Sequence, residues 1–215
     1  MRFDEAMISS LKNKVSARIS ERRFRHTLGV ERAASRIAAE ILPESINEIR
    51  CAALLHDVTK ELSVGEHIEI MNALSERPTD SDYMSQPLYH SITAPVVIRR
   101  DFPEYATQNI LSAVRNHTSG APDMSLFDEI IFLADFIEDN RTYEACKEIR
   151  EEFFSSLDTL RDREEKIQML HKTTVKVLDF TIVYIVNNTM YLNERTVETR
   201  NAFLGRLPVP LKKEY

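Results

Sequence analysis

Glycine is scarce in this sequence, with only 4 among 215 residues. Loops that hold phosphates through backbone amides need several closely spaced glycines. The scarcity therefore excludes a P-loop and a glycine-rich dinucleotide-binding loop. Any phosphate chemistry must use metal ions or cationic side chains instead.

Cysteine is also scarce. Cys51 and Cys146 lie far apart in the sequence, and Cys51 is inside an apolar run. At that separation they cannot form a CxxC metal or redox pair. We predict that both are reduced, structural thiols.

Long basic stretches and long apolar runs are missing as well. The formal net charge is -6, and no lysine- or arginine-dense stripe carries interleaved aromatics, which argues against a nucleic-acid partner. The most apolar stretch, TTVKVLDFTIVYIVNN, contains Lys176 and Asp179 and is shorter than the roughly 20 residues of a membrane-spanning helix. The N-terminal MRFDEAMISSLKNK lacks the apolar segment of a signal peptide. We expect a cytoplasmic protein with no membrane partner, and the sequence leaves a homodimer open.

Apolar residues make up 43% of the chain and recur at intervals of three and four, which predicts an all-α fold. The β-branched run 181–186 favours a strand by propensity, but no partner strand is evident, so we assign it to a helix. We expect one structural unit, with a core over residues 1–155 and C-terminal helices over 156–215 packed on it. The expected helices cover 3–18, 21–41, 45–58, 63–75, 87–100, 104–118, 125–139, 143–154, 160–192 and 195–204.

Two serines are predicted to begin helices through capping boxes. Ser45 is followed three residues later by Glu48, and Ser63 by Glu66. In this motif the two side chains satisfy backbone amides that have no partner within the helix.

Several ionisable side chains share the apolar faces of the predicted helices. His26 is on the stripe of Val30 and Ile37, and the other helices repeat this pattern. Burying so many ionisable groups without partners would cost several kcal/mol for each charged carboxylate, whereas a shared cation removes that cost. The inward-facing set is His26, His56, Asp57, His90, His117 and Asp135.

The string CAALLHDVTK shows the simplest alternative. Taken alone, His56 reads as a satisfied core histidine beside Asp57 at a helix end. The remaining histidines, His67 and His171, are next to charged residues, and we predict that both are ordinary surface residues.

Imidazole and carboxylate ligands together suit iron, manganese, zinc or nickel. Six ligands are too many for one catalytic metal that must keep an open position. Two metals bridged by one carboxylate fit better, and such a pair promotes in-line phosphoryl displacement.

The ordered ligand set resembles that of the HD-domain metal-dependent phosphohydrolases. The strings RRFRHTLGV, AALLHDVTKEL, HSITAP, NHTSG, IIFLADFIEDNR and TVETRNAFL are similar to those of the YqeK-type HD proteins, which are symmetrical bis(5′-nucleosyl)-tetraphosphatases. The resemblance covers nearly the whole chain. It implies an HD helical bundle that cuts diadenosine tetraphosphate into two ADP. The sequence departs from the family at Asn116, where an aromatic is common, and at Asp139, where a proline is common.

The resemblance also implies how the ligands are shared. His26, His56, Asp57 and Asp135 would hold one metal, and Asp57, His90 and His117 the second, with iron as the expected metal and manganese also compatible. A metal-bridging hydroxide would attack the phosphorus, with Asp57, His56 and Lys60 as the catalytic set.

Roles outside the ligand set stay open at this point. Lys60 could neutralise a phosphate or be a solvated lysine at a helix end, and Arg141 could grip a phosphate or cap a helix. Thr118 and Ser119 could bind substrate or form a turn, and Arg200 and Asn201 match a late family motif or tie down a C-terminal helix. The alternative functions are a phosphohydrolase of another nucleotide and a non-catalytic nucleotide-binding sensor.

Overall fold

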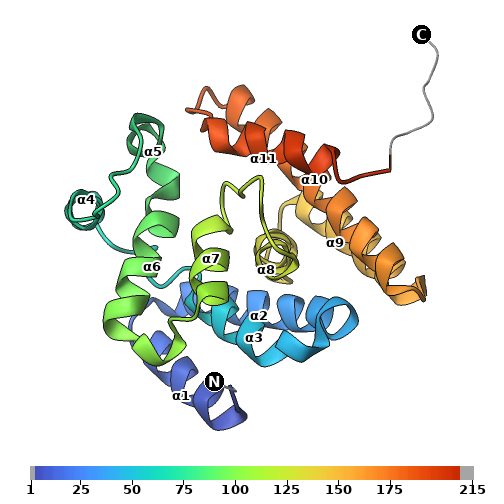
Figure 1. Cartoon of the computed structure of the whole chain (residues 1–215), viewed down its shortest axis with the longest axis horizontal. Helices are drawn as coiled ribbons and strands as arrows, with labels where there is room; N and C mark the ends of the chain where they lie inside the picture. Colours follow the sequence, from blue (N-terminus) through green and yellow to red (C-terminus); the bar gives the residue numbers. More distant parts are fainter. Residues whose placement is uncertain (1–2, 209–215) are drawn as a thin grey trace.

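The structure is a computed structural model that describes residues 3–208. All regular secondary structure within these residues is helical, as Figure 1 shows. The helices are α1 (Glu5–Ser16), α2 (Glu21–Ile41), α3 (Ile46–Leu55), α4 (Val64–Asn72), α5 (Asp80–Met84), α6 (Tyr89–Asp101), α7 (Gln108–Asn116), α8 (Leu126–Ile137), α9 (Glu144–Thr159), α10 (Arg163–Asn187) and α11 (Glu194–Leu204).

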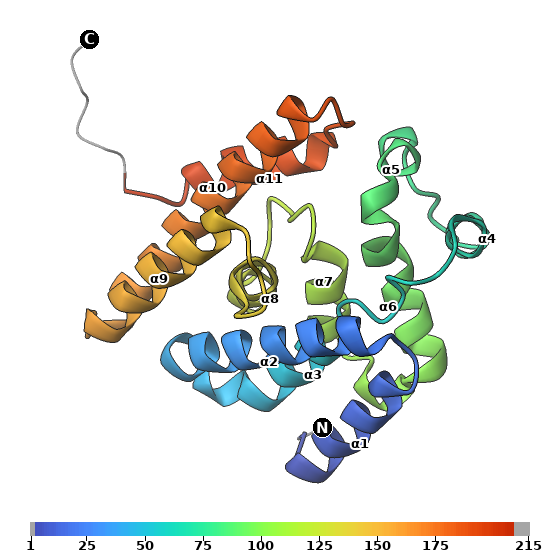
Figure 2. The same ribbon diagram turned by 180° about the vertical axis from the view of Figure 1, so that it is seen from behind.

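Helix α8 runs through the middle of the molecule and is seen end-on in Figures 1 and 2. Helices α2, α3, α7, α9 and α10 all pack against it. Its side chains are apolar on nearly all sides, and Phe127, Ile131 and Leu133 are at most 4% exposed. A helix enclosed by others needs such an all-round apolar surface. The last turn of α8 carries Asp135 into this crowded centre.

Helices α2 and α3 make the most extensive contact of any two described helices. Both place small residues in the core, including Ala34 and Ala38 on α2 and Ala52 and Ala53 on α3, all of them fully buried. Small side chains let two helix backbones approach closely, and this approach brings the end of α3 next to the first half of α2.

The two predicted capping boxes have different outcomes. Ser63 and Glu66 form the predicted box at the start of α4, with the Ser63 amide donating to Glu66 Oε2 at 2.7 Å. The prediction for Ser45 is wrong, because its side chain makes no capping bond at the start of α3. Glu48 instead accepts a 2.6 Å hydrogen bond from Thr107, so a contact with the start of α7 replaces the local motif.

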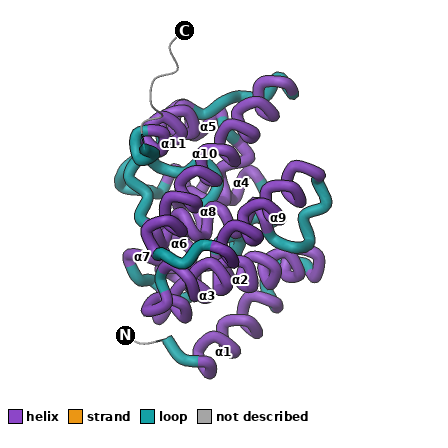
Figure 3. Tube along the Cα trace, turned by 90° about the vertical axis from the view of Figure 1, so that its right-hand side faces the viewer, coloured by secondary structure: helices purple, strands orange, loops and turns teal. Residues whose placement is uncertain are grey.

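The prediction of an all-α fold is confirmed over residues 3–208, where Figure 3 shows only helices and loops. The run 181–186 is helical within α10, as expected. The helix expected over 160–192 is shorter, the one over 143–154 is longer, and α5 was not predicted at all. None of the described helices combines the length and the apolar character that crossing a membrane requires. Both cysteines are buried and free, as predicted.

Candidate metal centre

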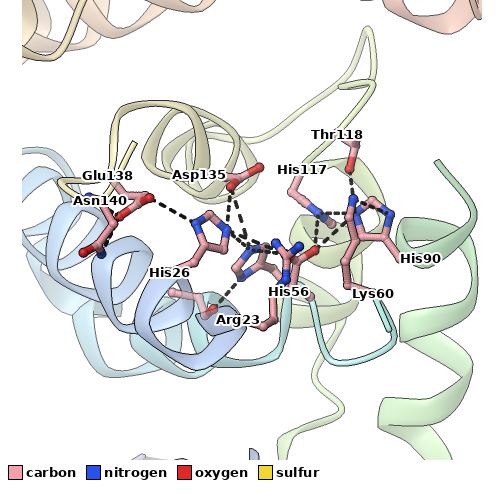
Figure 4. Close-up of polar contacts among 12 residues, drawn as sticks. Arg23, His26, His56, Lys60, His90, His117, Thr118, Asp135, Glu138 and Asn140 are labelled. Atoms are coloured by element: carbon pink, nitrogen blue, oxygen red, sulfur yellow. Dashed lines mark hydrogen bonds and ion pairs between the residues drawn. The ribbon is translucent and has the colours of Figure 1, made fainter. Parts of the chain in front are cut away.

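Five helices bring ionisable side chains to one place (Figure 4). The contributing elements are α2, the turn after α3, the first turn of α6, the residue after α7 and the last turn of α8. All six side chains that the sequence predicts as ligands meet here, namely His26, His56, Asp57, His90, His117 and Asp135. His56, Asp57, His90 and His117 are buried, whereas His26 and Asp135 are partly exposed.

The two oxygens of Asp57 face different pairs of histidines. Its Oδ2 lies 3.6 Å from His26 Nε2 and 3.5 Å from His56 Nε2. Its Oδ1 lies 3.3 Å from His90 Nε2 and 3.7 Å from His117 Nε2. Asp135 Oδ1 joins the first pair, 3.0 Å from His26 Nε2. Asp57 is therefore placed as a carboxylate shared between two groups of donors.

The local fold around residue 56 explains why both polar residues turn inward. Helix α3 ends at Leu55, and a tight turn follows in which the Val58 amide donates to Leu55 O at 3.1 Å. The Lys60 amide then donates to Asp57 O at 2.9 Å. His56 therefore lies in the cluster at the end of the buried helix. The turn that follows places Asp57 in the cluster and Lys60 next to it.

The orientations of the imidazole rings fit a bound cation. His56 Nδ1 donates to Ala53 O, and His117 Nδ1 donates to Val114 O, each at 2.7 Å. A carbonyl oxygen can only accept, so each ring keeps its proton on Nδ1 and presents the lone pair of Nε2 to the cluster. His56 Nε2 lies 3.3 Å from His26 Nε2, and His117 Nε2 lies 3.0 Å from His90 Nε2. Nitrogen lone pairs converging with carboxylate oxygens suit transition-metal ions.

Glu138 supports the cluster from behind, and sequence reasoning missed it. The His26 Nδ1 group lies 3.1 Å from Glu138 Oε1, and the glutamate is 1% exposed. Its other oxygen accepts two bonds from Asn140, at 2.7 Å and 2.8 Å. Burial disfavours a charged imidazole, but the bonds to Asp135 and Glu138 outweigh it and raise the pKa of His26 to about 9. No local pattern marked Glu138, because it lies one residue beyond the end of α8.

Arg23 was missed as well. Its Nη1 donates to Asp57 Oδ2 at 2.7 Å. It precedes His26 by three residues, so both side chains are on the same face of α2.

Burial would raise the pKa of Asp57, but His56 and the other cluster histidines hold that pKa well below its usual range, and the carboxylate stays charged.

Lys60, Thr118 and Arg141 lie at the edge of the cluster. Lys60 Nζ is 3.1 Å from both ring nitrogens of His90, and Thr118 Oγ1 is 3.2 Å from His90 Nε2. Arg141 donates to the backbone oxygen of Asp135 at 3.0 Å and to its carboxylate at 2.6 Å. Arg141 therefore both caps the end of α8 and contacts a cluster residue.

Three other candidates are placed away from the cluster. The Ser119 hydroxyl donates to Gly120 O within the turn after α7. Arg200 donates to Asp179 at 2.7 Å and so ties α11 to α10, with Asn201 beside it. None of the hydrogen bonds described for these three residues involves a cluster residue.

The prediction that His67 and His171 are surface residues is wrong. They are 5% and 8% exposed. His67 Nδ1 lies 2.9 Å from Thr93 Oγ1, and His171 Nδ1 lies 2.9 Å from Glu129 Oε2. Each histidine contacts a polar side chain on another helix. Neither belongs to the cluster.

A family model of the HD domain matches residues 23–140, which include all six cluster residues. The chain belongs to the HD-domain family. This HD-domain chain is 31% identical over 136 residues to the protein named "Bis(5'-nucleosyl)-tetraphosphatase, symmetrical" from Bacillus subtilis, covering 63% of this chain and 72% of that protein. It is 24% identical to the protein of the same name from Staphylococcus aureus, over 91% of this chain and 94% of the relative.

A solved structure also resembles the HD-domain chain over nearly its full length. It is described as a predicted HD superfamily hydrolase involved in NAD metabolism from Clostridium acetobutylicum. The TM-score is 0.79 at 26% identity, over 95% of this chain and 100% of that one. The family resemblance and the helical bundle predicted from the sequence are both confirmed.

Proposed function

We propose that this HD-domain chain is a metal-dependent hydrolase that cleaves diadenosine tetraphosphate symmetrically into two ADP. Two observations support the substrate and the reaction type. The relatives from Bacillus subtilis and Staphylococcus aureus carry the name of that activity, and the region matched by the HD family model contains the whole His/Asp cluster.

The placement of Asp57 carries the proposal of two metal ions. Because each of its oxygens faces a separate histidine pair, we assign His26, His56, Asp57 and Asp135 to one ion and Asp57, His90 and His117 to the other. The mixed nitrogen and oxygen donors suit a transition metal, and the resemblance to the YqeK-type proteins favours iron, with manganese as the alternative. When bound, two such ions supply a hydroxide nucleophile and stabilise the charge on the phosphorus under attack.

The chain's own side chains prepare this centre for a polyphosphate. The hydrogen bonds to Ala53 O and Val114 O fix two imidazole rings with their lone pairs inward. Lys60 lies beside His90 and Arg141 beside Asp135, so the two cationic side chains flank different parts of the cluster. We assign both, with Thr118, to the phosphate oxygens on either side of the bond that breaks.

The decisive experiment combines metal analysis with product analysis. The purified chain is supplied with iron or manganese and given diadenosine tetraphosphate, and chromatography separates paired ADP from AMP plus ATP. Asp57→Ala should lose turnover and bound metal together, because both ion positions share this carboxylate. Asp139→Ala is the matched control, since Asp139 is exposed and pairs with Arg32 outside the cluster.

Three outcomes would contradict the proposal. Asp57→Ala with full activity and normal metal content would remove the metal assignment. Formation of AMP plus ATP, or preference for another nucleotide in a substrate panel, would mean a different phosphohydrolase. Binding of the nucleotide without turnover in iron and in manganese would mean a sensor.

A further inference from the structure

A second pocket lies behind the two helices that carry His90 and His117. On α6, His90 shares its face with Ala94 and Val97, whereas Ile92, Pro95, Val96 and Arg99 line the pocket. On α7 the pocket is lined by Gln108, Leu111, Ser112 and Arg115, three and four residues apart. Each helix therefore presents one face to the metal centre and the opposite face to this pocket. The loop before α5 and the start of α11 complete its wall, and these elements can be followed in Figure 1.

The pocket is large enough for a metabolite. Its volume is about 720 Å³, and small-molecule sites commonly measure about 300 to 1,000 Å³. One part of its lining is apolar, formed by Leu74, Ile92, Pro95, Val96 and Leu111. The remaining lining is mostly charged or polar.

Three arginines in the lining have spare hydrogen-bonding capacity. Within residues 3–208, the side chains of Arg77 and Arg99 make no hydrogen bond or ion pair, and both residues are exposed. Arg115 is partly exposed, and its ionic partner Asp82 is 3.6 Å away. Burial and the nearby Arg195 lower the pKa of Arg115 to about 10. The guanidinium groups of these three arginines therefore keep N–H donors that no group within residues 3–208 accepts.

The lining also holds four acidic residues, which match its four arginines in formal charge. One carboxylate oxygen of Asp82 and one of Asp128 accept the hydrogen bonds of the capping boxes that begin α5 and α8. Glu76 and Asp123 are exposed to solvent. The fourth arginine, Arg195, is already engaged and donates to Gly120 O and Asn116 Oδ1, each at 2.8 Å.

We infer that this pocket binds a phosphorylated small molecule of nucleotide size. Its phosphate groups lie against Arg77, Arg99 and Arg115, and its uncharged part lies on the apolar wall. Guanidinium groups bind phosphate oxygens bidentately and are the side chains best suited to this task. An inorganic anion alone would leave the apolar wall uncovered. The site is separate from the metal centre and does not depend on the proposed function.

The test is a calorimetric titration of the full chain, as purified, with ATP and with inorganic tripolyphosphate. We expect saturable ATP binding that is tighter than tripolyphosphate binding, because the nucleoside covers apolar surface. Arg99→Gln should weaken this binding at least tenfold. Arg100→Gln should leave it unchanged, since Arg100 pairs with Asp101 and does not line the pocket. Arg99 is exposed, so its substitution does not disturb the core.

His26→Ala separates this pocket from the metal centre. The variant should lose metal and still bind ATP with unchanged affinity, provided that its melting curve shows a folded protein. Lys60→Ala is a second variant at the metal centre, and its affinity for ATP should also be unchanged. Loss of ATP binding in folded variants of both kinds would place the nucleotide at the metal centre and overturn the inference. Equal weakening by Arg99→Gln and Arg100→Gln, or the absence of saturable binding, would overturn it as well. Equal affinity for tripolyphosphate and ATP would rule out a ligand of nucleotide size.

Discussion

If the proposed metal centre is correct, removing the charge of Glu138 should weaken metal binding without altering any proposed ligand. In Glu138→Gln the side chain keeps its size, and its amide oxygen can still accept from His26 Nδ1, now 3.1 Å from the carboxylate. Loss of a hydrogen-bonding partner of a metal-ligating histidine typically costs 10- to 100-fold in metal affinity. Because Gln keeps a neutral bond, we expect about tenfold, or about 1.4 kcal/mol. Glu138→Ala removes the bond entirely and should cost about 100-fold.

The assay is a competition titration of Mn²⁺ between the protein and a chromophoric chelator. Asp139→Asn is the matched control, because Asp139 is the next residue, is exposed and pairs with Arg32 instead of His26. The expected order of affinity is wild type equal to Asp139→Asn, then Glu138→Gln, then Glu138→Ala. Wild-type affinity in Glu138→Ala, or an equal loss in Asp139→Asn, would refute the reasoning. Melting curves without metal would show whether folding is altered.

Three further predictions concern groups that the structure places in the interior. A Cβ on Gly29 would lie 2.1 Å from Glu138 Oε2. Gly29→Ala should therefore displace that carboxylate and lower metal affinity about tenfold in the same titration. Unchanged affinity would mean that Glu138 does not orient His26. His171→Ala removes the histidine that contacts the fully buried carboxyl group of Glu129. Because a buried polar group without a partner costs about 1 to 3 kcal/mol, urea denaturation should show a loss of about 2 kcal/mol or more in the free energy of unfolding. A loss below about 1 kcal/mol would contradict a stabilising contact between the two side chains. Burial raises the pKa of the Cys51 thiol to about 12. Iodoacetamide at pH 8 should therefore label this thiol only after unfolding, as measured by mass spectrometry. Rapid labelling of Cys51 in the native protein would contradict this prediction.

The residues of the cluster could be predicted from the sequence because the helical spacing of apolar residues indicates which face of each helix is buried. Ionisable residues such as His26 and Asp135 share the stripes of apolar neighbours, and helices that bury those stripes must bring them inward. The order of these residues along the chain then carried the family resemblance. The general fold could be predicted for the same reason, since nearly every segment shows the helical period.

Contacts between distant segments were beyond this reasoning. Glu138 follows a helix end, and only the packing of α8 on α2 brings it to His26, 112 positions away in sequence. His67 and His171 are next to charged residues in sequence, yet their partners are on other helices. The Ser45 motif failed in the same way, because Glu48 found a partner at the start of α7. Local pattern indicates which face is buried, but it does not identify the partner across the interface.

The cluster draws its side chains from five helices that span positions 26 to 135. A cation in this place would act as a crosslink of the native state, and a ligand present at a thousandfold excess over its Kd stabilises a fold by about 4 kcal/mol. That is a large share of the roughly 5 to 15 kcal/mol by which most domains are stable. In a cell deprived of the metal, more copies would unfold and be degraded by proteases. The abundance of this protein would then follow the metal supply even with its synthesis unchanged.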